Sequence, residues 1–425
     1  MCLDAVRPPL YVEQICFNLL SPSHEGAFVH EARQVRSMRA YLSTDFYARI
    51  ARPPAELRGT RVISNPAGMT VLAWGVDRAL TAVPALDRMI QDAFGICAYR
   101  DVSERDRHTY AQLLTMAAIL TLCWAASIVP AYRLCRLWLA PPASMAVSLA
   151  CVFNPATANF TPGKDPAQLL TVLLLLHLAL RACVSNRRIA ALAAGAVLAG
   201  SLTIGLIHVW IALIVIFATG WHAHRHGAGL RAWAVTCVAP AVGGFVAAAV
   251  LLWALTGWNI VHSTWAVAQR YPEIQRHLIN GVWTLVGLPL FLLFAGPMLW
   301  GMVLAVRPQR SLPGGGGPVD AGDDAARLGR ALLTCTAAVM VYTYFFANNN
   351  ETPRLWIPFL AMLIISMSLT RDAFRTDAAR HRRVLVVLIA AQIVVSALQW
   401  SMMDVREAEY RILPGPDGSP PRLWD

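Results

Sequence analysis

The sequence predicts an all-α fold: a polytopic membrane helical bundle of about ten transmembrane helices, with an outward-facing N-terminal region that contains interfacial helices. Three observations predict this class. Of the 425 residues, 56% are hydrophobic and only 14% are charged, whereas soluble domains carry roughly a quarter charged residues. The mean hydropathy is +0.49. The apolar residues form runs long enough to cross a bilayer, with basic residues between them. This composition argues against a soluble cytosolic enzyme.

Residues 1–108 form a predicted extracytoplasmic region with no spanning segment of its own. Phe28–Leu42 and Gly68–Phe94 show helical periodicity with charges interspersed, which is typical of helices that lie on the membrane interface. Met1–Leu20 has neither the basic nor the apolar part of a signal peptide. Either a first transmembrane helix is encoded upstream of Met1, or the region is translocated in another way, and we favour the upstream helix.

Residues 109–402 contain the predicted transmembrane bundle. Apolar runs of the required length, about 17 to 25 residues with some shorter ones, occur at 109–132, 138–155, 166–182, 189–204, 206–220, 231–257, 281–306, 331–347, 355–370 and 384–402. The uncharged stretch from Ile189 to His224 is compatible with one long helix or with two short ones broken near Gly205. Two helices are favoured, because one helix would disturb the alternation of the loops.

The basic residues of the loops indicate the orientation. One alternating set of loops carries sixteen arginines, and the other carries only four basic residues: Lys164, Arg270, Arg276 and Arg354. By the positive-inside rule the arginine-rich set faces the cytoplasm, so the net charge of +11 calls for no nucleic-acid partner. The segments then predicted to face outward are 1–108, 156–165, 258–280, 348–354 and the tail 403–425. Leu312–Asp324 is predicted to be a flexible cytoplasmic linker.

Two acidic residues lie at the outer ends of the predicted spans, each near a cation. Asp165 follows Lys164 in FTPGKDPAQLL, and Glu351 precedes Arg354 in ANNNETPRLW. Ionisable groups at membrane depth are costly and by default indicate a functional site. The alternative is structural, since an Asp before Pro166 is a good helix start and the arginine can extend to the interface. Because both acids fall on the same predicted face, we favour a site there.

The N-terminal region supplies two further carboxylates, each preceded by a histidine. SHEGAFVHEARQ contains His24-Glu25 and His30-Glu31. A zinc peptidase requires HExxH, with two histidines one helical turn apart, and the six-residue spacing here does not provide it. The sequence therefore predicts no metal ligands in this segment. A carboxylate at the boundary of membrane and water can serve as a general base, and the alternative is a solvated charged helix.

These three segments together resemble the multi-spanning GT-C glycosyltransferases, the class of the protein mannosyltransferases and the bacterial arabinosyl- and lipid-A-sugar transferases. That family has an Asp-Glu-x-x-Tyr pattern in its first outward loop, to which His24-Glu25-Gly-Ala-Phe28 with Ala32 is similar. NPATANFTPGKDPAQLL resembles its outer loop with Asp at a later helix start. Glu351-Thr-Pro-Arg354-Leu-Trp-Ile-Pro358 resembles its late Glu-x-x-Arg loop. The leading Asp of the family is His24 here, and the helix that precedes this loop in the family would lie upstream of Met1.

The resemblance implies an inverting transferase at the outer face of the cell membrane. An acceptor hydroxyl would attack the sugar of a polyprenyl-phosphate donor, and a carboxylate would take the proton of that hydroxyl. The implied partners are the lipid-linked donor, a glycan, lipid or protein acceptor, and membrane lipids, with no nucleic acid. Some members of the family need a divalent cation and others do not, and no residue of this sequence decides between the two.

The resemblance also implies roles for individual residues. Glu25 would be the base, with Glu31 as its substitute, and Asp165 would be a second acidic residue of the catalytic site. The remaining residues are implied to bind substrate: His24 beside Glu25, Lys164 and Arg354 on the donor phosphate, and Glu351 as the partner that orients Arg354.

Two other functions are compatible with the sequence. The first is a transporter or flippase of a lipid-linked or polymer precursor, but the chain shows no internal repeat, and its charged candidates lie at the outer ends of the spans and not at the midplane. The second is a non-catalytic, decayed paralogue, suggested by His24 and by the lack of a first helix in this sequence.

Overall fold

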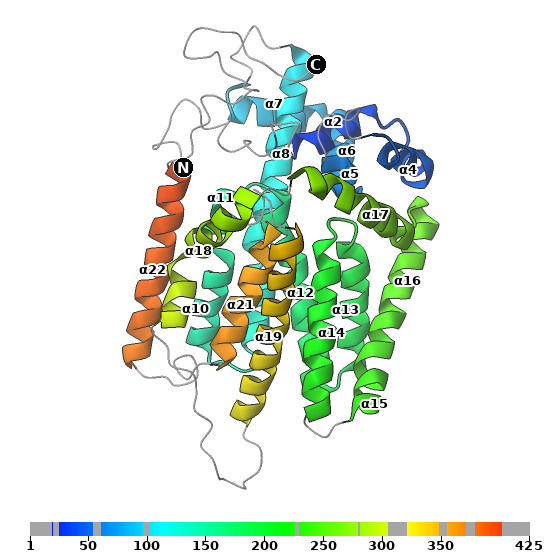
Figure 1. The fold of residues 1–425 in the computed structure, drawn as a ribbon. Coiled ribbons are helices and arrows are strands. Elements are labelled where there is room, and N and C mark those ends of the chain that lie inside the picture. The colour runs from blue at the N-terminus through cyan, green and yellow to red at the C-terminus, as the bar shows by residue number, and fades with distance from the viewer. Residues whose placement is uncertain are drawn as a thin grey trace, which may run out of the picture.

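Figure 1 shows the computed structural model, which describes residue 19 and residues 25–53, 61–96, 103–225, 229–278, 281–304, 321–347, 355–370 and 379–401. Within these ranges the chain is helical and has no strand, so the all-α prediction is confirmed. The long helices run side by side as a bundle, and the N-terminal helices (blue in Figure 1) lie across one end of it.

The N-terminal region is a layer of short helices, which we call the head. These are α2 (Gly26–Gln34), α3 (Met38–Ala40), the π-helical turn η1 (Tyr41–Asp45), α4 (Phe46–Ile50), α5 (Arg61–Ser64), α6 (Gly68–Ala82) and α7 (Pro84–Ala93). The predicted helical stretch Gly68–Phe94 is thus two helices that meet at Val83. The break has a local cause, because the proline at the first position of α7 suits a helix start and cannot continue α6.

The head is attached to the bundle by two apolar clusters. In the first, Phe28 of α2 packs with Tyr110 of α8 (Glu104–Ala126), and both side chains are fully buried. In the second, Ile63 of α5 packs with Leu202 and with Trp258, two residues of the connections between bundle helices. Burial of large apolar side chains is the main source of stability here, so the head is an integral part of the fold.

Each predicted apolar run contains helix in the part of the chain that the structure describes. The bundle consists of α8, α9 (Ile128–Cys135), α10 (Pro141–Val152), α12 (Lys164–Ser185), α13 (Arg188–Ser201), α14 (Ile207–Arg225), α15 (Leu230–Trp233), η4 (Ala234–Val238), α16 (Ala239–Thr256), α18 (Gly281–Leu304), α19 (Ala321–Ala347), α21 (Ile357–Thr370) and α22 (Ala379–Ser401). Among the described residues, five stretches are long and apolar enough to cross a membrane: Glu104–Cys135, Lys164–Ser185, Ile207–Arg225, Leu230–Thr256 and Asp324–Phe345. Five more apolar helices are shorter, so the count of ten spans and their orientation stay predictions.

The stretch from Ile189 to His224 is two helices, as favoured from the loop alternation. The first, α13, ends at Ser201, and the second, α14, begins at Ile207. Gly205 lies in the break, and its carbonyl oxygen accepts a hydrogen bond from Nδ1 of the buried His208 at 2.9 Å.

Three segments predicted as loops or linker contain helix instead. The outer segment 258–280 is mostly α17 (Ile260–Leu278), in which Ile260 and Val267 lie on one helical face and are buried. The outer segment 156–165 overlaps the short helix α11 (Pro155–Asn159). The end of the predicted linker Leu312–Asp324 is helical from Ala321, because those residues extend the apolar helix α19.

Helix α18 is interrupted, and a side chain of α22 satisfies its broken end. Gly296 has a φ of 78°, a left-handed conformation that glycine adopts without strain. Beyond the break, the backbone N–H of Met298 donates to Oε1 of Gln392 at 3.2 Å. The amide nitrogen of Gln392 donates to the carbonyl oxygens of Ala150 at 2.8 Å and Phe153 at 3.1 Å, which end α10. One buried amide thus joins the ends of two helices.

Helices α13 and α16 approach each other through glycine. A Cβ atom added to Gly195 would lie 1.8 Å from the carbonyl oxygen of Ala241, and one added to Gly244 would lie 1.9 Å from that of Leu192. Only glycine permits such an approach of two backbones, which is the usual means of helix packing in membranes.

Candidate functional site

The first turn of α12 carries a buried ion pair. The side chains of Lys164 and Asp165 belong to residues only 4% and 6% exposed, and Nζ lies 3.8 Å from Oδ1 of the carboxylate. The position follows from the sequence, since the extended Gly163 precedes the helix and Pro166 suits its first turn. A carboxylate here also faces the positive end of the helix dipole.

Two amide side chains hold this pair in place. Nζ of Lys164 donates to Oδ1 of Asn65, which follows α5 in the head. On the other side, Nε2 of Gln168 donates to Oδ1 of Asp165 at 3.1 Å. Gln168 in turn lies against Gly205, where an added Cβ would be 2.7 Å from its Oε1. Buried charges are tolerated only when they are paired and hydrogen-bonded, and this network meets that condition where the head meets the bundle.

Glu25 is a buried carboxylate at the start of α2. The residue immediately precedes α2 and is 2% exposed, and its Oε2 has no hydrogen-bond partner among the described residues. The next residues of α2, Ala27 and Phe28, belong to the apolar cluster against which Ala167 of α12 packs. The starts of α2 and α12 therefore share one apolar cluster, although no hydrogen bond or ion pair joins Glu25 to Lys164 in the described structure.

Glu31 forms an ion pair with another residue of the head. Its carboxylate forms an ion pair with the guanidinium of Arg49 on α4. Burial raises the pKa of Glu31 above its ordinary value, and Arg49 opposes this effect only in part. The adjacent Tyr41 has a raised pKa because of its burial, and the Glu31 carboxylate adds to this. The structure thus shows a head-internal contact for Glu31, which the residue spacing alone did not predict.

The remaining predicted site residues, His24, Glu351 and Arg354, lie outside the described residues. The segment that follows Arg354 is firmly packed, because Trp356 is buried and its Nε1 donates to Oγ1 of Thr343 at 3.2 Å.

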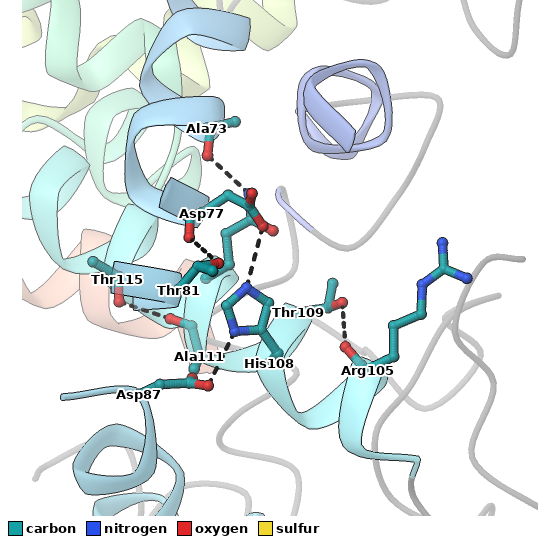
Figure 2. A network of polar contacts seen from close by, with 10 residues as sticks. Ala73, Asp77, Thr81, Asp87, Arg105, His108, Thr109, Ala111 and Thr115 are labelled. Atoms are coloured by element: carbon teal, nitrogen blue, oxygen red, sulfur yellow. Dashed lines mark hydrogen bonds and ion pairs between the residues drawn. The ribbon is translucent and has the colours of Figure 1, made fainter. Parts of the chain in front are cut away.

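A second polar cluster in the head was not predicted from the sequence. Figure 2 shows the ring of His108 between two carboxylates: Nδ1 faces Oδ2 of Asp87 at 3.0 Å, and Nε2 faces Oδ1 of Asp77 at 3.1 Å. A ring with an acceptor at each nitrogen must donate from both, so it is an imidazolium. The hydrogen bond from His108 lowers the pKa of Asp77. The cluster ties α6, α7 and α8 together.

The residues of this cluster are 10 and 21 positions apart in the chain, which is why no local pattern predicts it. One imidazolium lies between two carboxylates and joins three helices, so we interpret the cluster as structural. Within the described ranges, no three His, Cys, Asp or Glu residues gather in a way that could hold a metal ion.

No protein-family model, no curated protein and no solved structure matches this chain. The similarity to GT-C transferases therefore rests on the quoted motifs, and the fold and the buried polar cluster of α12 rest on this structure.

Proposed function

We propose that this chain is a membrane glycosyltransferase of the GT-C type, which transfers a sugar from a polyprenyl-phosphate donor to an acceptor hydroxyl at the outer membrane face. The observation that carries the proposal is the buried pair Lys164–Asp165, fixed by Asn65 and Gln168 at the start of α12 and beneath the head. Such a fixed charge pair at a helix end is costly to bury, and a functional site accounts for it.

Lys164 is assigned to the donor phosphate. Its ammonium group has three N–H donors, and Asn65 uses one of them. A cation held in a low-dielectric region stabilises the negative charge that the phosphate gains as the sugar leaves. Asp165 keeps the ammonium group in position, and Arg354, oriented by Glu351, is assigned as a second cation on the same phosphate.

Glu25 is assigned as the general base. Its Oε2 accepts the proton of the acceptor hydroxyl while the hydroxyl oxygen bonds to the anomeric carbon of the sugar. The bond from that carbon to the phosphate oxygen breaks, and the polyprenyl phosphate leaves with both electrons of that bond. Attack from the side opposite the phosphate inverts the configuration. Glu25 is favoured over Glu31 because the latter is paired with Arg49.

The test uses the full chain in proteoliposomes with a panel of synthetic polyprenyl-phosphate sugars, and mass spectrometry measures the polyprenyl phosphate released. Glu25→Gln keeps the size of the side chain and removes the base, so we expect release to fall by about 10²- to 10⁴-fold. Glu104→Gln, an exposed acid at the start of α8, is the matched control and should have no effect. Arg354→Ala should abolish transfer without affecting insertion.

Full release by the Glu25→Gln protein would contradict the assignment of the base, and no release from any donor would favour a non-catalytic protein. The same vesicles test for a flippase through the movement of a fluorescent lipid-linked precursor across the bilayer. The interrupted helix α18 is the feature that suggests transport, but Gln392 already accepts a hydrogen bond from the backbone N–H of Met298 beside the break, so we expect no movement without transfer.

A further inference from the structure

A large cavity lies between α14 and α19, and the residues of the α12 polar cluster are not among those that line it. Its volume is about 960 Å³, which is at the upper end of the range of roughly 300–1,000 Å³ for small-molecule pockets. Figure 1 shows α14 and α19 side by side. Contacts at both ends confirm this: the rings of Trp210 and Tyr342 lie 5.5 Å apart at one end, and His222 lies 3.5 Å from Asp324 at the other.

The α14 wall is an apolar stripe that ends in a cation. Its residues recur every three or four positions and so share one helical face: Trp210, Leu213, Phe217, Trp221 and Arg225. Phe217 and Trp221 are 64% and 59% exposed, so no described part of the protein covers them. The guanidinium carbon of Arg225 lies 5.1 Å from the ring centre of Trp221.

The α19 wall repeats this pattern in the opposite chain direction. Arg327 and Arg330 stand in its first turns, and Ala338 and Tyr342 continue the stripe toward the head. Three arginines therefore meet at the end of the cavity that is distant from the head. Within the described chain no carboxylate lies within 4.0 Å of them, and Asp324, the acid recorded at this end, faces His222.

We propose that this cavity binds one anionic phospholipid of the leaflet that faces the arginine-rich loops. The arginines bind the phosphate headgroup, and an acyl chain lies along the apolar stripe. The length fits, because the 15 steps from Trp210 to Arg225 rise about 22 Å, more than half of the roughly 30 Å hydrocarbon core. Basic pockets between spanning helices on this side of a membrane are the chemistry that selects anionic headgroups. The site is independent of the proposed transferase activity.

The test is native mass spectrometry of the full chain in neutral detergent, titrated with phosphatidylglycerol or with phosphatidylcholine. Three cations near the headgroup predict a preference for phosphatidylglycerol on the order of 100-fold. The variant Arg225→Gln/Arg327→Gln/Arg330→Gln should lose this preference. The control Arg187→Gln/Arg188→Gln removes two exposed arginines at the turn between α12 and α13 that do not line this cavity, and should keep the preference.

A second variant tests the apolar part of the cavity separately from its arginines. It remains informative even if the triple substitution impairs folding. Ala338→Trp fills the apolar stripe and leaves all three arginines, so retention of phosphatidylglycerol should fall while the protein elutes normally in size exclusion. Equal binding of both lipids to the wild type, or loss of preference in the Arg187/Arg188 control, would overturn the proposal. Full displacement of phosphatidylglycerol by glycerol phosphate would also overturn it, because the site would then bind free anions.

Discussion

The amide of Gln392 is expected to be one of the most important side chains for the stability of the bundle. Replacing it with leucine keeps a similar volume and removes three hydrogen bonds, to the N–H of Met298 and to the carbonyl oxygens of Ala150 and Phe153. All three are backbone groups, one beside the break in α18 and two at the C-terminal end of α10. In the apolar interior of a membrane bundle they have no water to take the place of the lost partner.

The magnitude follows from the number of bonds. Side-chain hydrogen bonds between membrane helices contribute about 0.6 kcal/mol on average and about 1.7 at most. Three of them give a loss of about 2–5 kcal/mol in the free energy of unfolding for Gln392→Leu. Gln392→Glu should be intermediate or worse, because a carboxylate can still accept from Met298 but can donate to neither carbonyl when ionised.

The assay is unfolding of the purified chain in mixed micelles with increasing SDS, followed by far-ultraviolet circular dichroism. The neighbouring Ile393→Ala is the control, since Ile393 is 52% exposed and lies away from the interrupted ends. If Gln392→Leu unfolds within about 0.5 kcal/mol of the wild type, the range of ordinary surface substitutions, then the interrupted helices do not depend on this amide and the reasoning is wrong.

Two further predictions concern packing and pH. Gly244→Leu should lower the free energy of unfolding by about 1–3 kcal/mol or more, the usual cost of overpacking, because a Cβ added at Gly244 would lie 1.9 Å from a backbone oxygen. The control is Gly243→Leu, since a Cβ added at Gly243 has no atom within 4 Å. This variant should be neutral in the same SDS titration. The hydrogen bond from His108 lowers the pKa of Asp77 in the folded protein. The ionised Asp77 carboxylate therefore stabilises the fold at pH values above its pKa in the unfolded chain, and this stabilisation is lost as the pH falls through its pKa in the folded protein. Asp77→Asn should therefore be less stable than the wild type at pH 7, with the difference shrinking toward pH 3, whereas the exposed Asp92→Asn should match the wild type at both.

Features that depend on neighbours in the chain were predictable from the sequence. Apolar runs gave helices, Gly205 marked the break between α13 and α14, and Lys164-Asp165-Pro166 gave a charged helix start. The local physics of helix starts and of hydrophobic periodicity is enough for these features. The burial of these charges was not part of that prediction, because it depends on the head helices that cover the start of α12.

Features that depend on distant partners were not predictable. The pairing of Glu31 with Arg49 requires α2 and α4 to lie together, and the alignment of His108 with Asp77 and Asp87 requires three helices to meet. The interruption of α18 depends on Gly296 adopting a left-handed backbone, whereas a run of apolar residues reads as one continuous helix. Single-sequence patterns contain no information about such contacts.

The contact between α13 and α16 has a consequence for the assembly of the bundle. The stretch Leu230–Thr256 is the most hydrophobic of the five candidate spans, with a hydropathy of 2.2, yet only 6% of its most apolar window is buried within the protein. Such a segment is stable in lipid before it meets any partner. We therefore expect it to enter the membrane on its own and to dock late, guided by the fit of Gly195 and Gly244, so that hydrogen exchange should detect its detachment at a lower free energy than global unfolding.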